Sequence, residues 1–168
     1  PETPAETPAP AYTSPYTEQI AAQKAKNDET VGWIKIQGTN IDYPIMYDAT
    51  GKLGYSGKDA DGKKSTSGAV YMHHNVATAD SYGIGQNLVL TAHNSRVSKT
   101  MFHQLHHIQE VNLGKTECAY RKCKEALDPN TLPNLKTPEG RTWEIALDGI
   151  DGKWEVWSFY EVNDKEPE

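Results

Sequence analysis

The chain has 168 residues, of which 36% are hydrophobic, and a formal net charge of −6. The length predicts one domain, and a polar tail would account for the low hydrophobic fraction. The acidic balance argues against an electrostatic nucleic-acid surface, and no apolar run approaches the ~18 residues that a membrane span needs. The chain starts at Pro1 with neither a methionine nor a visible signal peptide, so we expect a processed or trimmed piece.

The N-terminal region contains two segments of different character. Residues 1–16 are rich in proline, glutamate and threonine. Such a segment cannot bury a core and prefers extended states, so it predicts a linker or stalk in front of a folded domain at 17–168. Residues 17–26 predict a helix on the surface of that domain, with Thr17 as its N-cap.

The pattern of the remaining chain is mostly that of strands. Alternating or continuous apolar runs predict strands at 33–36, 41–47, 68–75, 88–91, 143–147 and 154–160. Pro44 removes a hydrogen-bond donor, so the second of these strands is expected to lie at a sheet edge or to be bulged there. Glycine, lysine, aspartate and serine dominate residues 50–67, which predicts an exposed loop.

Helical insertions are predicted between the later strands. Residues 99–110 predict a helix, and the helix is expected to resume after Gly114 and to continue through Ala126. Four apolar residues recur at helical spacing in the first of these segments and are expected to pack on the sheet. They are Met101, Phe102, Leu105 and Ile108. Several strands with few helices favour a mostly β barrel or sandwich with helical insertions.

His93 is the candidate catalytic residue. It follows the short apolar strand at 88–91, and a histidine at the mouth of a buried strand has a rigid base and projects into a loop region. This arrangement is a good way to hold a general acid or base in a fixed place. The alternative is a histidine that merely ends a strand.

The other histidines favour roles without metal. His73 and His74 are adjacent on a predicted strand and therefore face opposite sides, so they do not chelate one ion together. His103 and His107 are four residues apart on a predicted helix and could bind zinc with a third ligand, but no metalloprotease pattern accompanies them. We therefore prefer a solvated helix face, and we expect neither a metal nor a cofactor.

In their order and spacing, five segments resemble a sortase, and most of all a class B sortase. They are VGWIKIQGTNIDYP at 31–44, GAVYM at 68–72, LVLTAHN at 88–94, MFHQL at 101–105 and WEVWSFY at 154–160. The resemblance implies a sortase-like β-barrel preceded by an N-terminal helix.

The resemblance also implies a cysteine transpeptidase on the outer face of a Gram-positive bacterium, with the proline-rich start as a stalk behind a removed membrane anchor. In this family a thiolate attacks a threonyl carbonyl of a sorting motif in a surface protein or pilin, and a peptidoglycan or pilin amine resolves the thioester. His93 would protonate the departing amine and deprotonate the incoming one, and an arginine would stabilise the oxyanion.

The chain departs from the family pattern near its end. In the family the cysteine ends a strand beyond the equivalent of residues 154–160, and the arginine lies on the next strand, whereas this chain has neither. We therefore expect a barrel that is incomplete at its C-terminal end and a chain that is inactive alone. The alternatives are a non-catalytic sortase-like binding or scaffold domain, and a domain completed by a second chain through strand swapping or dimerisation.

Neither cysteine of the chain matches the missing nucleophile well. Cys118 lacks an apolar strand before it, and it precedes two strands that should come first. Cys123 matches less well still, and the spacing of the two is neither that of a redox pair nor that of a usual zinc half-site. Arg96 is near His93 in sequence, but a solvated loop arginine is the preferred interpretation.

Overall fold

The structure is a computed structural model that describes residues 14–47, 54–72, 89–120, 123–147 and 153–156. Its helices are α1 (Thr17–Lys24), α2 (Leu105–Asn112) and α3 (Pro138–Arg141), with a 3₁₀ turn η1 (Phe102–Gln104). Its strands are β1 (Thr30–Lys35), β2 (Asp42–Tyr47), β3 (Val70–Met72), β4 (Leu90–Thr91), β5 (Asn94–Ser95), β6 (Thr100–Met101), β7 (Thr142–Leu147) and β8 (Lys153–Glu155). The fold is mostly β with few helices, and the predicted fold class is confirmed.

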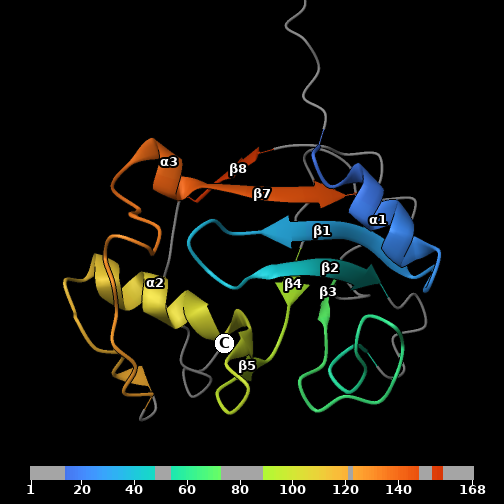
Figure 1. Ribbon diagram of the computed structural model, residues 1–168, viewed down its shortest axis with the longest axis horizontal. Coiled ribbons are helices and arrows are strands. Elements are labelled where there is room, and N and C mark those ends of the chain that lie inside the picture. Colours follow the sequence, from blue (N-terminus) through green and yellow to red (C-terminus); the bar gives the residue numbers. More distant parts are fainter. Residues whose placement is uncertain (1–13, 48–53, 73–88, 121–122, 148–152, 157–168) are drawn as a thin grey trace, which may run out of the picture.

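Six strands form one curled sheet in the order β4-β3-β2-β1-β7-β8, and β5 and β6 form a separate pair. Neighbouring strands of the sheet are antiparallel except β2 and β3, which are parallel. A cavity of about 70 Å³ is lined by Leu90 of β4 together with Ile145, Leu147 and Trp154 of β7 and β8. Because residues from both ends of the sheet line the same cavity, the sheet is a half-barrel (Figure 1).

The core lies inside this curl. Ile34 on β1, Ile45 on β2 and Val70 on β3 are buried in one cluster, and Ile108 of α2 belongs to the same cluster. The predicted apolar stripe therefore packs as expected, because Met101, Phe102 and Leu105 are partly buried against this core. Alternation along β1 and the 3.6-residue period along α2 place these side chains on one face of each element. In Figure 1, α1 and α2 lie toward opposite ends of β1 and β2.

The N-terminal helix is confirmed, but its cap differs from the prediction. Tyr16 is the N-cap residue of α1, and Thr17 is already inside the helix. The Thr17 hydroxyl donates to the Ser14 carbonyl oxygen at 3.1 Å, and Ser14 Oγ accepts from the Tyr16 amide at 3.0 Å. The Thr17 hydroxyl therefore bonds to a residue that precedes the helix, and it does not accept a hydrogen bond from the backbone amides of the first helical turn.

Pro44 does not place β2 at a sheet edge. β2 pairs with β1 on one side and with β3 on the other, so this prediction is wrong for the strand as a whole. The β2–β3 ladder begins at Ile45, and the proline therefore removes no donor from that ladder. The predicted bulge has a counterpart nearby, because the β1–β2 register is irregular between Thr30 and Gly32, opposite Ile45 and Met46 and next to the Trp33–Pro44 pair.

The loop predicted at 50–67 is exposed or half-buried in its described part, 54–67, except at one residue. Tyr55 is only 1% exposed. Its hydroxyl donates to the Glu29 carboxylate and accepts from Asn27 Nδ2, the latter at 2.9 Å. This buried tyrosine fastens the loop to the segment that precedes β1.

The predicted helices after His93 are wrong at two places. Residues 99–104 are not α-helical: Lys99 and Met101 have left-handed backbones with φ of 56° and 59°, and α2 begins only at Leu105. The helix also does not resume between Gly114 and Ala126 in the part of that segment that the structure describes. There the chain folds back as a hairpin-like loop, in which the Cys118 amide donates to the Glu125 carbonyl at 2.7 Å. Backbone hydrogen bonds across the loop, between its two arms, replace the local hydrogen bonds of a helix.

Several predictions fall outside the described residues. They concern the linker up to residue 13, the pair His73 and His74 and most of the strand predicted at 154–160. In the described ranges, every helix is too short or too polar to cross a membrane.

Candidate functional site

His93 lies between β4 and β5, and its backbone is held on both sides. Its carbonyl oxygen accepts from the Phe102 amide at 3.0 Å. Asn94, the next residue, pairs with Met101 in the β5–β6 ladder. The His93 side chain is exposed. The structure therefore places this histidine at the end of a strand, as the sequence predicts, but that strand is half-buried and not buried.

The imidazole ring of His93 is held in one orientation. Its Nε2 lies 2.8 Å from the Ser56 carbonyl oxygen, which can only accept a hydrogen bond. Nε2 therefore donates, and whenever the ring is neutral its Nδ1 carries the lone pair. Gly68 lies against the ring, since a Cβ built there would be 3.1 Å from His93 Cδ2. A fixed imidazole with one basic nitrogen is suited to accept and return a proton.

Four hydroxyl groups, three of them within seven residues after His93 and one next to Gly68, lie in contact with one another, and the sequence analysis missed them. Ser95 Oγ lies 2.5 Å from Ser98 Oγ and 3.4 Å from Ser67 Oγ. Thr100 Oγ1 is 2.7 Å from Ser98 Oγ. Ser67 precedes the glycine that touches the His93 ring, and Ser95 follows His93 by two residues. The hydroxyl groups thus link the β5–β6 turn to the loop beside the histidine.

In the described residues, neither cysteine of the chain makes a hydrogen bond with His93. Cys118 is 1% exposed, and burial, together with its hydrogen bond to Cys123, raises the pKa of its thiol to about 12. It is therefore a protonated core thiol at neutral pH and a poor nucleophile. Arg96 is exposed in the turn between β5 and β6, as the preferred interpretation of the sequence expects.

The preferred interpretation of His103 and His107 as part of a solvated helix face is wrong. Their exposed fractions are 2% and 4%. Cys123 Sγ lies 3.3 Å from His107 Nε2 and 3.3 Å from Glu125 Oε1. His103 Nε2 lies 2.8 Å from the same carboxylate oxygen and 4.0 Å from the sulfur. We call these four residues the His–Cys–Glu cluster.

Two pKa shifts follow from the packing of this cluster. Burial alone would raise the pKa of Glu125, but hydrogen bonds from His103 and Cys123 outweigh it and bring the pKa to about 2. Burial, and then the nearby His103 ring, lower the pKa of His107. At neutral pH Glu125 is therefore a carboxylate and His107 a neutral imidazole. The four-residue spacing of the histidines was the only sequence signal, because the loop that brings the other two residues has no regular pattern.

The two thiols are expected to differ in reactivity. Cys118 is buried with a raised pKa, whereas Cys123 is partly exposed. Brief treatment of the native metal-free chain with iodoacetamide should therefore add one carbamidomethyl group, at Cys123. Intact-mass measurement over time checks this, with Cys123→Ser as the variant that should not react and Cys118→Ala as the variant that should. Equal rates at both cysteines in the folded protein would contradict the assignment.

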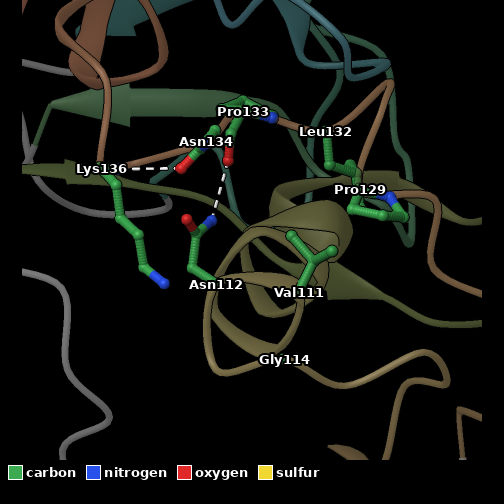
Figure 2. A pocket seen from close by; sticks show the side chains of 8 residues that line it. All are labelled: Val111, Asn112, Gly114, Pro129, Leu132, Pro133, Asn134 and Lys136. Atoms are coloured by element: carbon green, nitrogen blue, oxygen red, sulfur yellow. Dashed lines mark hydrogen bonds between the residues drawn. The ribbon is translucent and has the colours of Figure 1, made fainter.

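A pocket of about 170 Å³ lies away from His93, between the end of α2 and residues 129–136 (Figure 2). Asn112 stands in its wall and points toward Pro133. Its Nδ2 donates to the Pro133 and Ile108 carbonyl oxygens, each at 2.8 Å, and its Oδ1 accepts from the Leu135 amide at 2.8 Å. This side chain therefore fastens the loop to the helix, and we assign the pocket a structural role.

Replacing Asn112 by alanine should destabilise the fold by about 2–3 kcal/mol, because three hydrogen bonds of about 1 kcal/mol each are lost. The free energy of unfolding in urea measures this. Lys136→Ala is the matched control, since Lys136 lines the same pocket with an exposed side chain. A difference of less than about 0.5 kcal/mol between the two variants would show that Asn112 does not hold the loop.

Comparisons with known proteins agree on the fold. No protein-family model matches the sequence, and no curated protein matches it significantly. Among solved structures, a Staphylococcus aureus sortase B–substrate complex matches with a TM-score of 0.57 and 18% identity, covering 84% of this chain and 52% of that one. Clostridium perfringens sortase B matches with a TM-score of 0.56 and 21% identity over 82% and 60% of the two chains. Listeria monocytogenes sortase B matches with a TM-score of 0.57 and 17% identity, covering 80% of this chain and 61% of that one.

The chain therefore has a sortase-like fold, and its similarity is to class B sortases. Sequence identities at this level establish the fold and leave the activity to be argued from the site. The chain spans between about half and three fifths of the length of these structures.

Proposed function

We propose that this chain supplies the catalytic histidine, His93, of a class B sortase-type transpeptidase. The observation that carries the proposal is the fixed but exposed imidazole at the end of β4, held by the Ser56 carbonyl oxygen at 2.8 Å. The substrate is then the sorting motif of a surface protein or pilin, and the acceptor is an amine of peptidoglycan or of a pilin. One similar structure is a sortase B–substrate complex.

The reaction needs a thiolate and an oxyanion donor, which we propose come from strands outside this chain. The thiolate attacks the threonyl carbonyl carbon, and the C–N bond of the scissile amide breaks. A protonated His93 gives its proton to the departing amine, which leaves a thioester and a neutral imidazole. The incoming amine attacks the thioester, passes a proton to His93 and releases the thiolate. An arginine stabilises the negative oxygen of both tetrahedral intermediates.

The curled sheet has two edges at which such strands could pair. In the described part of the sheet, β4 and β8 each pair on one side only. Leu90, at one end, and Trp154, at the other, face the same apolar cavity, and Trp154 is 37% exposed. Additional strands that bury this surface would close the half-barrel beside His93, which directly follows β4.

The proposal places the chain on the outer face of a Gram-positive cell, where the sorting motifs and amine acceptors are found. The residues before Ser14 then serve as the stalk between a membrane anchor and the domain, since Ser14 is buried and the Tyr16 hydroxyl donates to Glu144 at 2.6 Å. A proline-rich composition suits a stalk because proline favours extended, solvated conformations.

A fusion tests the proposal. The chain is joined at Glu168 to the cysteine and arginine strands of a class B sortase, and it is offered a panel of threonine-containing sorting peptides with an amine acceptor. Mass spectrometry should detect the peptide–amine product with the fusion and none with the chain alone. If the fusion folds with the added strands paired to the sheet and yet produces neither cleavage nor transfer, the proposal fails.

The sides of β4 and β8 that stay unpaired in the described sheet also favour a second candidate, in which these edges pair with another copy of the chain. Edge strands with an apolar surface beside them are suited to pairing between chains. Sedimentation at increasing concentration would then show a dimer whose dissociation exposes Trp154 and changes its fluorescence. A chain that remains monomeric at all concentrations would exclude this candidate.

A further inference from the structure

The His–Cys–Glu cluster brings four metal-binding atoms together in the described part of the chain. Two imidazole nitrogens, one sulfur and one carboxylate oxygen all lie within 4.8 Å of one another. They come from three parts of the chain. The histidines lie on η1 and α2, and Cys123 and Glu125 lie on the loop that folds back at 117–126. The proposed transpeptidase uses none of them.

The spacing of the donor atoms matches a tetrahedral metal centre. With bonds of about 2.0–2.3 Å, neighbouring ligand atoms of a tetrahedral zinc site lie roughly 3.3–3.8 Å apart. The sulfur of Cys123 lies 3.3 Å from His107 Nε2 and 4.0 Å from His103 Nε2. The contact of 2.8 Å between His103 Nε2 and Glu125 Oε1 has to open by about 0.5 Å, and the widest donor pair, at up to 4.8 Å, has to close by about 1 Å.

The chemistry of the four donors selects zinc. Thiolate and imidazole are ligands of Zn²⁺, and one carboxylate commonly joins them. One thiolate, one carboxylate and two neutral imidazoles carry two negative charges, which balance a divalent ion in a largely buried place. Calcium and magnesium are disfavoured because they prefer oxygen ligands in larger number.

The surroundings orient one ligand as metal sites require. Asn94 Oδ1 lies 2.8 Å from His103 Nδ1. A proton on Nδ1 is donated to this oxygen, and in that tautomer the Nε2 lone pair points at the cluster. Ligating histidines commonly have such an outer partner for their second nitrogen. The partner here is Asn94 on β5, the residue after His93, so one hydrogen bond links the cluster to the neighbour of the candidate catalytic residue.

We propose that the His–Cys–Glu cluster is a zinc site with four protein ligands. A site that is closed by four protein ligands has no position for substrate, so its role is structural. The ion joins the 117–126 loop to η1 and α2, and through Asn94 it restrains the strand that follows His93. This inference does not depend on the proposed transpeptidase function.

Cobalt titration of the EDTA-treated 168-residue chain tests the site, because Co²⁺ in a tetrahedral thiolate site gives intense visible bands and a sulfur-to-metal charge-transfer band. We expect saturation at one Co²⁺ per chain, displacement by Zn²⁺, and a higher melting temperature with added Zn²⁺. Cys123→Ser should abolish the charge-transfer band. Asn94→Ala should weaken binding by about 10- to 100-fold.

The matched control is His106→Ala, which removes a histidine from the same helix outside the cluster. His106 stacks on Tyr120 at a centroid distance of 3.5 Å. This variant should bind metal as the parent chain does. The proposal is overturned if the parent chain shows no charge-transfer band at one equivalent, or if the band persists in Cys123→Ser. If Cys123→Ser fails to fold, the cobalt charge-transfer band and the zinc-dependent melting temperature of the parent chain still show whether the site binds metal.

Discussion

In the fusion that carries the added cysteine and arginine strands, His93→Ala is expected to lower kcat/KM for peptide transfer by about 10²–10⁴-fold. This is the usual contribution of a positioned general acid–base group. The departing amine then has no proton donor, and the incoming amine has no base. The fold should persist because the side chain is exposed and its one described hydrogen bond, to the Ser56 carbonyl oxygen, is worth about 1 kcal/mol.

The control for this prediction is His106→Ala, which makes the same chemical change on α2. Peptide transfer by this variant should remain within about twofold of the parent fusion, and circular dichroism should show both variants folded. Equal rates of peptide transfer for His93→Ala and the parent fusion would show that His93 takes no part in the reaction. Equal losses in both histidine variants would indicate a structural effect.

Gly68→Ala should be among the most disruptive single substitutions. Gly68 has a left-handed backbone with φ of +65°, and a Cβ there would lie 2.5 Å from the Tyr55 carbonyl oxygen and 3.1 Å from His93 Cδ2. The backbone conformation costs about 1–2 kcal/mol for an alanine, and the overlap adds about 1–2 kcal/mol. We therefore expect a loss of about 2–4 kcal/mol in the free energy of unfolding.

Gly114→Ala separates these two contributions. Gly114 also has a left-handed backbone, with φ of +82°, but a Cβ there meets nothing within 4 Å. Urea denaturation should give only the conformational cost of about 1–2 kcal/mol for this variant. In the fusion, Gly68→Ala should also lower peptide transfer because it displaces the loop that holds the His93 ring. Equal destabilisation by the two variants would contradict close packing at Gly68.

The strands could be predicted where apolar alternation and packing agree. Ile34 and Ile45 face one core, so the period of two residues marked both β1 and β2. The sequence did not predict the role of Pro44, because pairing with β3 begins one residue later and depends on a distant segment. Tyr55 was also missed, since its burial depends on hydrogen bonds with residues that precede β1.

The candidate site was predictable only in part. The position of His93 followed from a short apolar strand that ends in a polar loop. The His–Cys–Glu cluster could not be found from spacing, because it requires the chain to fold back after residue 117 and bring Cys123 to the histidines. The expected helix through Ala126 would have pointed these side chains in other directions. The residues of this segment favour a helix, but the loop forms because hydrogen bonds across it outweigh that preference. One such bond runs from the Leu127 amide to the Thr116 carbonyl oxygen at 2.9 Å.

The central claim is that this chain supplies the acid–base histidine, and not the nucleophile, of a sortase-type enzyme. Intact-mass measurement after incubation with the sorting peptides tests it most directly. The account predicts an acyl adduct on the added cysteine of the fusion and an unchanged mass for the 168-residue chain alone. A thioester adduct on Cys118 or Cys123 of the chain alone, lost in the matching cysteine variant, would contradict the account.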